Sequence, residues 1–316
     1  RVKHVRQGKA YRVKHAKQNS NRQDRADRGI CPGRLEVIIM PALYAHECFG
    51  RAVEAQLDGE LAEIVRRYDA PFQAGFQGPD IFFFFGAHTN NAVVRFGEHL
   101  HSVSAAPFFA NAVGVIRQSG RMSKEYAYLC GFVCHFILDS ECHPYVEEMI
   151  KETGVQHLEI EEEFEKLLLK ENGKDPIGFP IDTLVPTDLL TAQAIQPFYP
   201  VKSQRFRSGG RKEYIPLAVI RQSLLSMKGI KRLLTAPQPW KQNAINAIMK
   251  LSGDNYKYAK GLMNQREDNP ACRVTNEGLK ARFDAAVPLA VEMLDSLDES
   301  IRTGKRLSRR FDRTFS

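Results

Sequence analysis

The sequence contains no apolar stretch long enough to cross a membrane. A membrane-spanning helix needs about 18 or more consecutive apolar residues, and a run such as Ile81–Phe85 is far too short. The basic first 39 residues also lack the apolar core of a signal peptide. With neither a membrane span nor an export signal in view, we expect a cytoplasmic protein.

Other signals are missing as well. The six cysteines show no Cys-x-x-Cys metal spacing, and Cys130, Cys134 and Cys142 are interpreted as reduced packing residues. A thiolate ligand from Cys142 is the less favoured alternative. Neither strand-like alternation nor an internal repeat is visible, whereas helical periodicity recurs along the chain. The sequence therefore predicts an all-α fold.

The formal charge of +8 comes from the head of the chain. Residues 1–39 hold eleven Lys or Arg against three Asp or Glu, and the rest carries 34 residues of each sign. Global charge therefore gives no reason to expect a nucleic-acid partner. The head is either a disordered basic arm or a translated leader upstream of a true start at Met40. We favour the leader, because Leu35–Val37 can be encoded by a purine-rich ribosome-binding sequence.

The stretch Tyr126–Glu161 carries the most informative pattern. Its first part, Tyr126–Leu138, is apolar nearly all round and predicts a buried helix. His135 and Asp139 lie four residues apart, so a helix places them on one face. His143 follows after four more residues, and Pro144 is expected to mark a turn.

A second helix is expected from near Val155, and it carries His157 and Glu161, again four residues apart. These two residues share a helical stripe with Phe164 and Leu168 and are expected to face inward. The other carboxylates of this helix are expected to fall mostly toward solvent; they are Glu159, Glu162, Glu163 and Glu165. An inward imidazole and carboxylate are costly unless they are paired or bind a cation.

Together the stretch offers three imidazoles and two carboxylates, a ligand set that suits zinc or a related transition metal. A single buried histidine is more often a hydrogen-bonded core residue. One His-x-x-x-Glu pair also occurs as a surface contact on helices. Two such pairs together with His143, all within 27 residues, favour a metal site over these alternatives.

Three further candidates precede this stretch. An amphipathic helix is expected over Ala42–Leu57, and it carries His46. A Gly-Pro-Asp turn places Asp80 at the edge of an apolar run, although Asp80 is equally well explained as a helix cap. Of His99 and His101, which are two residues apart, only one can point inward on a helix.

Helical patterns resume after a proline-rich part. A basic cluster around a Ser-Gly-Gly loop is more typical of a solvated loop than of a phosphate site; it contains Arg205, Arg207, Arg211 and Lys212. Helices are expected over Leu217–Leu234, Trp240–Met263 and Asn276–Thr303. The last should be capped by Thr275 and Gly304 and kinked at Pro288.

With these residues in view, the chain resembles the zinc-dependent phospholipase C family. This all-helical superfamily also includes the fungal single-strand nucleases and the phospholipase C/D domain of glycosylphosphatidylinositol-specific phospholipase D. The resemblance rests on an ordered series: His46, the turn at Asp80, a His within 99–101, His135-x-x-x-Asp139, His143 and His157-x-x-x-Glu161. It implies a multi-helix bundle with a zinc-binding core at 40–171 and a helical extension at 172–316 packed on the core.

The resemblance further implies two or three zinc ions. One ion would be held by Asp80, His101 (or His99), His135 and Asp139. A second would be held by His143, His157 and Glu161. A third would be held by His46 and Asp139, with Asp139 bridging. Family members complete the third site with an N-terminal Trp, which this chain lacks at that place.

Such a cluster suits the hydrolysis of a phosphate ester. A water shared by two zinc ions is deprotonated near neutral pH and attacks phosphorus in line, with Asp80 as ligand and proton acceptor. The first hypothesis is therefore a phospholipase C-like hydrolase acting on a phosphate ester such as a phospholipid. The alternatives are a nuclease or nucleotidase of the same superfamily, and a non-catalytic helical protein that zinc holds together for binding a partner.

Overall fold

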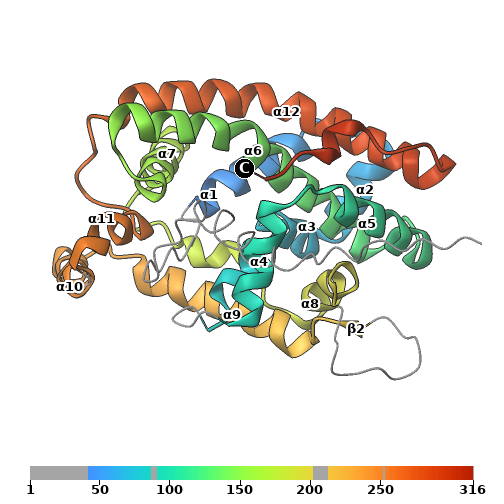
Figure 1. Cartoon of the computed structure of the whole chain (residues 1–316), viewed down its shortest axis with the longest axis horizontal. Coiled ribbons are helices and arrows are strands. Elements are labelled where there is room, and N and C mark those ends of the chain that lie inside the picture. The colour runs from blue at the N-terminus through green and yellow to red at the C-terminus, as the bar shows by residue number, and fades with distance from the viewer. Residues whose placement is uncertain (1–41, 87–90, 202–212, 252, 316) are drawn as a thin grey trace, which may run out of the picture. The chain divides into compact units, whose positions relative to one another are not determined.

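The computed structural model describes residues 42–86, 91–201, 213–251 and 253–315. The head of the chain and the basic cluster of residues 205–212 fall outside these ranges. Within them the regular secondary structure is helical apart from one pair of two-residue strands, which confirms the all-α prediction (Figure 1). None of the described helices is both long and apolar enough to cross a membrane.

The elements follow one another with short connections. The α-helices are α1 Leu43–Glu54, α2 Gly59–Arg67, α3 Asp69–Gly75, α4 Ala92–Ser102, α5 Ala106–Ser119, α6 Lys124–Thr153, α7 His157–Glu171, α8 Leu189–Ile195, α9 Leu217–Leu234, α10 Pro239–Lys250, α11 Tyr256–Ala259 and α12 Cys272–Thr303. The 3-10 helices are η1 Gly78–Phe84, η2 Ile181–Leu184, η3 Gln196–Phe198, η4 Gly253–Asn255, η5 Lys260–Leu262 and η6 Arg309–Asp312. Strands β1 Pro200–Val201 and β2 Glu213–Tyr214 pair antiparallel, with Pro200 opposite Tyr214.

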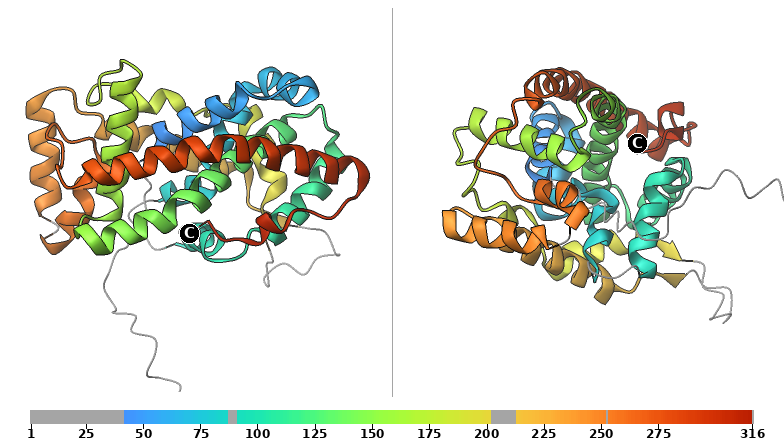
Figure 2. Two further views of the ribbon diagram at one scale, coloured as in Figure 1. Left: turned by 90° about the horizontal axis from the view of Figure 1, so that it is seen from above. Right: turned by 60° about the vertical axis from the view of Figure 1, so that its left-hand side comes forward.

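Helix α6 is the buried centre of the fold. All its residues from Glu125 to Ser140 are buried, as expected for a helix that is apolar nearly all round. Helices α1, α3 and α12 pack around it, and α12 runs beside α6 in Figures 1 and 2. Aromatic rings fill the space between α5, α6 and η6, where Phe109 and Phe136 meet Phe311. Each fully buried phenylalanine stabilises the fold by about 1.5–3 kcal/mol.

The expected turn at Pro144 is wrong. Helix α6 continues through Pro144 and ends at Gly154, which adopts a left-handed conformation with φ +72°. A proline inside a helix leaves the carbonyl four residues earlier without its usual donor, and here that carbonyl belongs to Ser140. The guanidinium of Arg313 donates to this carbonyl and also binds Glu141. Because Arg313 lies 173 residues away in the chain, the local sequence could not predict this compensation.

The helices of the C-terminal part follow the predicted ranges with local differences. Helix α9 covers the predicted Leu217–Leu234. Helix α12 begins at Cys272, four residues earlier than predicted, so Thr275 is buried inside the helix and does not cap it. The helix continues across Pro288 and ends at Gly304, with φ +80°. In place of one helix over the range 240–263, the described residues form α10, α11 and two 3-10 turns. The division between core and extension near residue 171 stays a prediction.

Candidate metal centre

Eight side chains from five elements converge in the interior of the described chain. They are His46 of α1, Asp80 of η1, His101 of α4, His135, Asp139 and His143 of α6, and His157 and Glu161 of α7. Their ligand atoms form three groups, each within 4.8 Å. The first is Asp80 with His101 and His135, the second is His46 with His135 and Asp139, and the third is His143 with His157 and Glu161. His135 belongs to two groups and joins them. His99, the alternative to His101, is exposed.

Gly78 lets the backbone pass close to the ring of His135. It adopts φ +46°, and a Cβ at this position would lie 2.1 Å from Cδ2 of His135 and 2.5 Å from its Nε2. Any side chain would therefore collide with the ring, and the positive φ independently favours glycine. Pro79 follows as an early residue of η1, the 3-10 helix that brings Asp80 to the same ring.

The first group pairs His101 with Asp80. Nδ1 of His101 lies 2.8 Å from the carbonyl oxygen of Gly97, and Nε2 lies 2.9 Å from Oδ1 of Asp80. A carbonyl and a carboxylate only accept hydrogen bonds, so a neutral imidazole with one N–H satisfies only one of these contacts. A cation bound by both Nε2 and the carboxylate would leave the single N–H on Nδ1 to donate to the carbonyl of Gly97.

The second group brings two imidazoles onto the carboxylate of Asp139. Nε2 of His46 lies 3.3 Å from Oδ1, and Nε2 of His135 lies 3.1 Å from Oδ2. Nδ1 of His135 faces the carbonyl oxygen of Phe76 at 3.1 Å and therefore carries the ring proton. Among the described residues, Nε2 of His135 and Oδ2 of Asp139 then have no hydrogen-bond partner. Two buried lone pairs facing each other are stabilised by a shared cation.

The third group lies nearest to solvent. Nε2 of His157 lies 2.9 Å from Oε1 of Glu161, and Nε2 of His143 lies 3.5 Å from the same oxygen. Oε2 of Glu161 is buried with no hydrogen-bond partner in the described part of the chain. The side chain of His157 is 27 % exposed, and its Nδ1 lies 3.6 Å from Glu147. This side of the cluster can therefore exchange ligands with water.

Asp139 links the second group to the third. Its Oδ1 lies 3.8 Å from Nε2 of His143, and residues 135, 139 and 143 lie on one face of α6. A cavity of about 30 Å³ lies beside the contact between Asp139 and His143. It is lined by these two residues, His46 and Glu161 together with apolar side chains. This space is large enough for a water molecule or a metal ion.

Comparison with known proteins adds one finding to this geometry. A model of the family described as zinc dependent phospholipase C matches residues 45–197. Residues 45–197 belong to the zinc-dependent phospholipase C family. None of the curated proteins and none of the solved structures matches the chain. The family match contains all eight residues of the cluster and ends before α9.

The donor set fits the metal after which the zinc-dependent phospholipase C family is named. Zinc binds imidazole nitrogen and carboxylate oxygen at about 2.0–2.2 Å in tetrahedral sites, which separates neighbouring ligand atoms by about 3.3–3.6 Å. The distances from imidazole Nε2 atoms to the carboxylate oxygens of Asp139 and Glu161 run from 2.9 to 3.8 Å and bracket this value. Three of the buried side-chain atoms that have no hydrogen-bond partner among the described residues also face this cluster, and they belong to His135, Asp139 and Glu161.

Burial and charge divide the histidines of the cluster into two kinds. Burial lowers the pKa of His46 to about 4, although Asp139 opposes the shift, so its ring is neutral at pH 7. Burial also disfavours the charged form of His143, but Asp139 and Glu161 outweigh it and raise the pKa to about 9. Burial alone would raise the pKa of Asp139, but His135 and His143 hold it well below its usual range. In the metal-free protein a proton on His143 therefore supplies the positive charge beside Asp139 and Glu161 that a bound metal ion would otherwise supply.

The other carboxylates of α7 are buried, so the expectation that they face solvent is wrong. The segment 264–270 folds over that face of the helix. Glu162 accepts a hydrogen bond from the backbone N–H of Gln265 at 2.6 Å, and Glu163 accepts one from that of Asn269 at 2.7 Å. Glu159 accepts from the side chain of Asn269 at 2.8 Å. The cause is tertiary, and helical periodicity could not reveal it.

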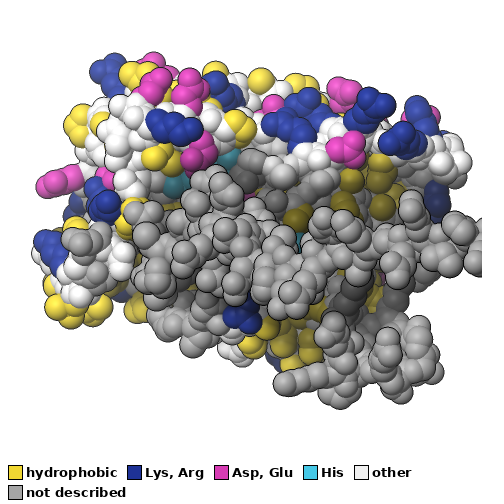
Figure 3. Space-filling model, viewed as in Figure 1, with side chains coloured by type: hydrophobic (Ala, Val, Ile, Leu, Met, Phe, Trp, Pro, Cys, Tyr) yellow, Lys and Arg dark blue, Asp and Glu magenta, His cyan; other side chains and the backbone are white. Residues whose placement is uncertain are grey.

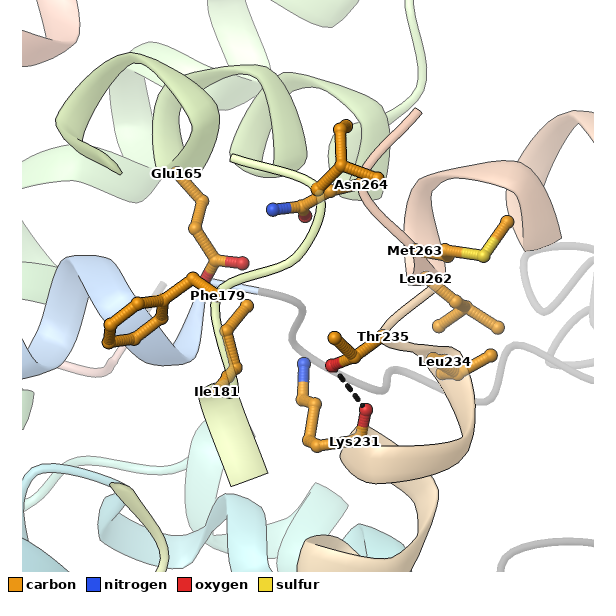
Figure 4. Close-up of a pocket in the computed structure, with 10 residues that line it drawn as sticks. Glu165, Phe179, Ile181, Lys231, Leu234, Thr235, Leu262, Met263 and Asn264 are labelled. Carbon is orange, nitrogen blue, oxygen red and sulfur yellow. Dashed lines mark hydrogen bonds between the residues drawn. The ribbon is translucent and has the colours of Figure 1, made fainter. Parts of the chain in front are cut away.

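Glu165 is buried at a different place, beside Lys231 of α9. Figure 4 shows both side chains at a small pocket next to Phe179. Oε2 of Glu165 accepts from the backbone N–H of Tyr44 at 2.8 Å, in the first turn of α1, whose cap residue Ala42 has no hydrogen-bonding side chain. Burial raises the pKa of Glu165 to about 7, against the effect of Lys231, and burial lowers the pKa of Lys231. This carboxyl therefore fixes the start of the helix that carries His46.

Sequence reasoning missed one residue that shapes the cluster and underused another. Phe315 is buried, and its ring centroid lies 5.3 Å from that of His101 and 5.8 Å from that of His135. It shields this side of the cluster from water, and no motif marks it in the sequence. Gly78 could have been found, because a Gly-Pro dipeptide marks a turn and glycine adopts a positive φ there without steric cost.

Proposed function

We propose that this protein is a zinc-dependent phosphoric ester hydrolase of the phospholipase C type. The joining of three ligand groups through His135 and Asp139 supports this function most directly. In the proposed assignment one ion is held by Asp80, His101, His135 and Asp139, a second by His143, His157 and Glu161, and a third by His46 with Asp139. Zinc bound there supplies a Lewis acid that withdraws charge from phosphoryl oxygens and lowers the pKa of a bound water.

The chain's own residues supply a proton acceptor and keep bulk water away. Asp80 is buried, and His101, tied to the carbonyl of Gly97 through Nδ1, fixes its carboxylate. We assign to Asp80 the proton that the attacking water loses as its oxygen bonds to phosphorus. The opposite phosphorus–oxygen bond breaks, the alkoxide takes up a proton from solvent and leaves as the alcohol, and Asp80 returns its proton to solvent. Phe315 excludes water behind the rings of His101 and His135.

Hydrolysis of phosphatidylcholine vesicles by zinc-loaded protein tests this proposal, with release of phosphocholine and diacylglycerol as the readout. We expect release by the wild type and a loss of about 100-fold or more in Asp80→Asn. Glu162→Gln, a buried carboxyl on the other side of α7, is the matched control and should retain activity. Zinc content measured on each variant separates loss of metal from loss of the proton acceptor. A fully metallated wild type that hydrolyses no lipid in a broad panel would contradict a lipid substrate.

The two alternatives give different results in the same assays. A nuclease or nucleotidase would cleave single-stranded DNA or 3′-nucleotides and leave lipids intact. For a non-catalytic protein held together by zinc, Asp80→Asn would change no measured hydrolysis. In that case His157→Ala would still lower the melting temperature.

A further inference from the structure

Helix α10 presents its apolar side outward. A surface helix normally buries its apolar stripe and exposes its polar face. The buried residue of α10 is the polar Gln242, whereas Trp240, Ile248 and Leu251 are 71 %, 67 % and 86 % exposed. With exposed Ala244 and Ala247 they form an arc of about 100°, which we call the α10 stripe. Figure 3 shows hydrophobic side chains gathered at the lower left, where α10 lies in Figure 1.

The polar side of α10 is attached mainly through hydrogen bonds. Nε2 of Gln242 donates to the carbonyl oxygen of Asn264 at 2.9 Å, and Nδ2 of Asn246 donates to Oε1 of Gln265 at 3.0 Å. A cavity of about 600 Å³, lined mostly by polar and charged side chains, lies between α10 and α7. A helix of 12 residues is only marginally stable without apolar contacts. A partner that covers the stripe would therefore stabilise α10.

The surroundings of the stripe are basic. Residues 240–260, which cover α10 and the turns that follow it, contain four Lys and one Asp, although the chain from Met40 onward is neutral overall. Lys250 and Lys257 are exposed, and the carboxylates of the cavity lie on the inner side of α10. A nucleic acid would match the charge but not the apolar stripe. A second copy of the chain would match the stripe but bring the same positive charge. A surface that is anionic outside and apolar beneath matches both features.

We propose that the α10 stripe docks into the headgroup region of an anionic phospholipid bilayer. Tryptophan rings favour this region, and amphipathic helices flanked by lysines lie in its plane with the apolar face buried. Each buried large apolar side chain is worth about tenfold in affinity, and each lysine near the anionic surface about fivefold. The docking does not depend on the proposed hydrolysis, although it would bring a lipid substrate to the protein.

Trp240 is the single tryptophan of the chain, so its fluorescence reports on the stripe alone. Zinc-loaded protein is mixed with vesicles of phosphatidylcholine and phosphatidylserine in equal parts, or of phosphatidylcholine only. The emission maximum of Trp240 and the fraction of protein that co-sediments are both measured. We expect a blue shift and co-sedimentation with the anionic vesicles, at least about tenfold tighter than with the neutral ones, and weaker at high salt.

The variant Ile248→Asp/Leu251→Asp tests the stripe directly. We expect it to bind anionic vesicles at least about tenfold more weakly, with an unchanged melting temperature. Leu189→Asp/Leu190→Asp, a matched pair of half-exposed leucines on α8, should bind as the wild type does. Cleavage of a soluble short-chain phosphate ester should stay the same in both variants, which separates docking from the proposed function.

Three results would overturn the proposal. The first is the absence of vesicle binding at low salt. The second is co-sedimentation without a shift of Trp240 fluorescence, which would place the membrane contact elsewhere. The third is a blue shift that follows protein concentration without vesicles and accompanies dimer formation, which would assign the stripe to a second copy of the chain.

Discussion

Replacing Asp139 with asparagine tests the metal centre at its most connected residue. The carboxylate lies within 3.3 Å of His46 and His135 and within 3.8 Å of His143. Asparagine keeps the shape but removes the negative charge and one acceptor oxygen. Partners that merely orient metal ligands are worth 10- to 100-fold in metal affinity, so we expect a loss of about 100-fold or more at a residue shared by two groups.

The loss of zinc affinity can be measured as a change in thermal stability. Zinc at about a thousandfold excess over its dissociation constant stabilises a protein by about 4 kcal/mol, which for a domain of this size raises the melting temperature by roughly 10 °C. At the same zinc concentration, a variant that binds 100-fold more weakly gains about 1.4 kcal/mol, or roughly 4 °C. The measurement is the difference between melting curves with zinc and with a chelator, combined with zinc content per chain.

Glu165→Gln is the control for this experiment. It neutralises another buried carboxyl, one that faces the N–H of Tyr44 and not an imidazole. We expect it to keep the full zinc content and the full shift of about 10 °C. The reasoning is refuted if Asp139→Asn binds as much zinc as the wild type, with the same shift in melting temperature.

Three further predictions concern the centre and its support. Protons compete with zinc on His143, whose pKa is about 9, so zinc affinity should rise about tenfold per pH unit from pH 7 and level off above pH 9; titration calorimetry showing a flat profile would contradict this. Gly78→Ala should push the ring of His135 aside and abolish zinc binding in elemental analysis. It should also lower the free energy of unfolding by about 1–2 kcal/mol, because alanine disfavours the left-handed backbone. Full zinc content in this variant would refute the steric cause. Lys166→Met should destabilise the fold by about 3–5 kcal/mol in urea, because it leaves the buried carboxylate of Glu163 without its ammonium partner; a loss below about 1 kcal/mol would mean that Lys166 contributes little.

Local periodicity predicted the helical fold and the gathering of the ligand candidates. His135 and Asp139, and likewise His157 and Glu161, lie four residues apart on helices whose apolar stripes set the inward direction. That information is local, and short-range geometry preserves it in the folded protein. The choice between His99 and His101 was left open, since the sequence does not show that Nε2 of His101 meets Asp80.

The wrong predictions share a different cause. The turn at Pro144 was argued from proline chemistry, and that chemistry holds, but Arg313 satisfies the carbonyl that proline leaves free. The solvent-facing carboxylates were argued from the helical wheel, but a distant segment supplies backbone N–H donors to Glu162 and Glu163. In both cases the deciding partner lies about a hundred or more residues away, beyond the reach of any local pattern.

The hydrogen bond from Arg313 to the carbonyl of Ser140 also couples metal binding to the anchoring of the segment that follows α12. It keeps α6 unbroken between Asp139 and His143, so the register of the ligands depends on a segment that follows α12. Coupling of this kind is reciprocal: if the anchored segment favours metal uptake, metal uptake favours anchoring by the same factor. A protease that cuts near Arg310 should therefore act faster on metal-free protein than on metallated protein. Its cleavage rate would then report metal binding at a site that the protease does not contact.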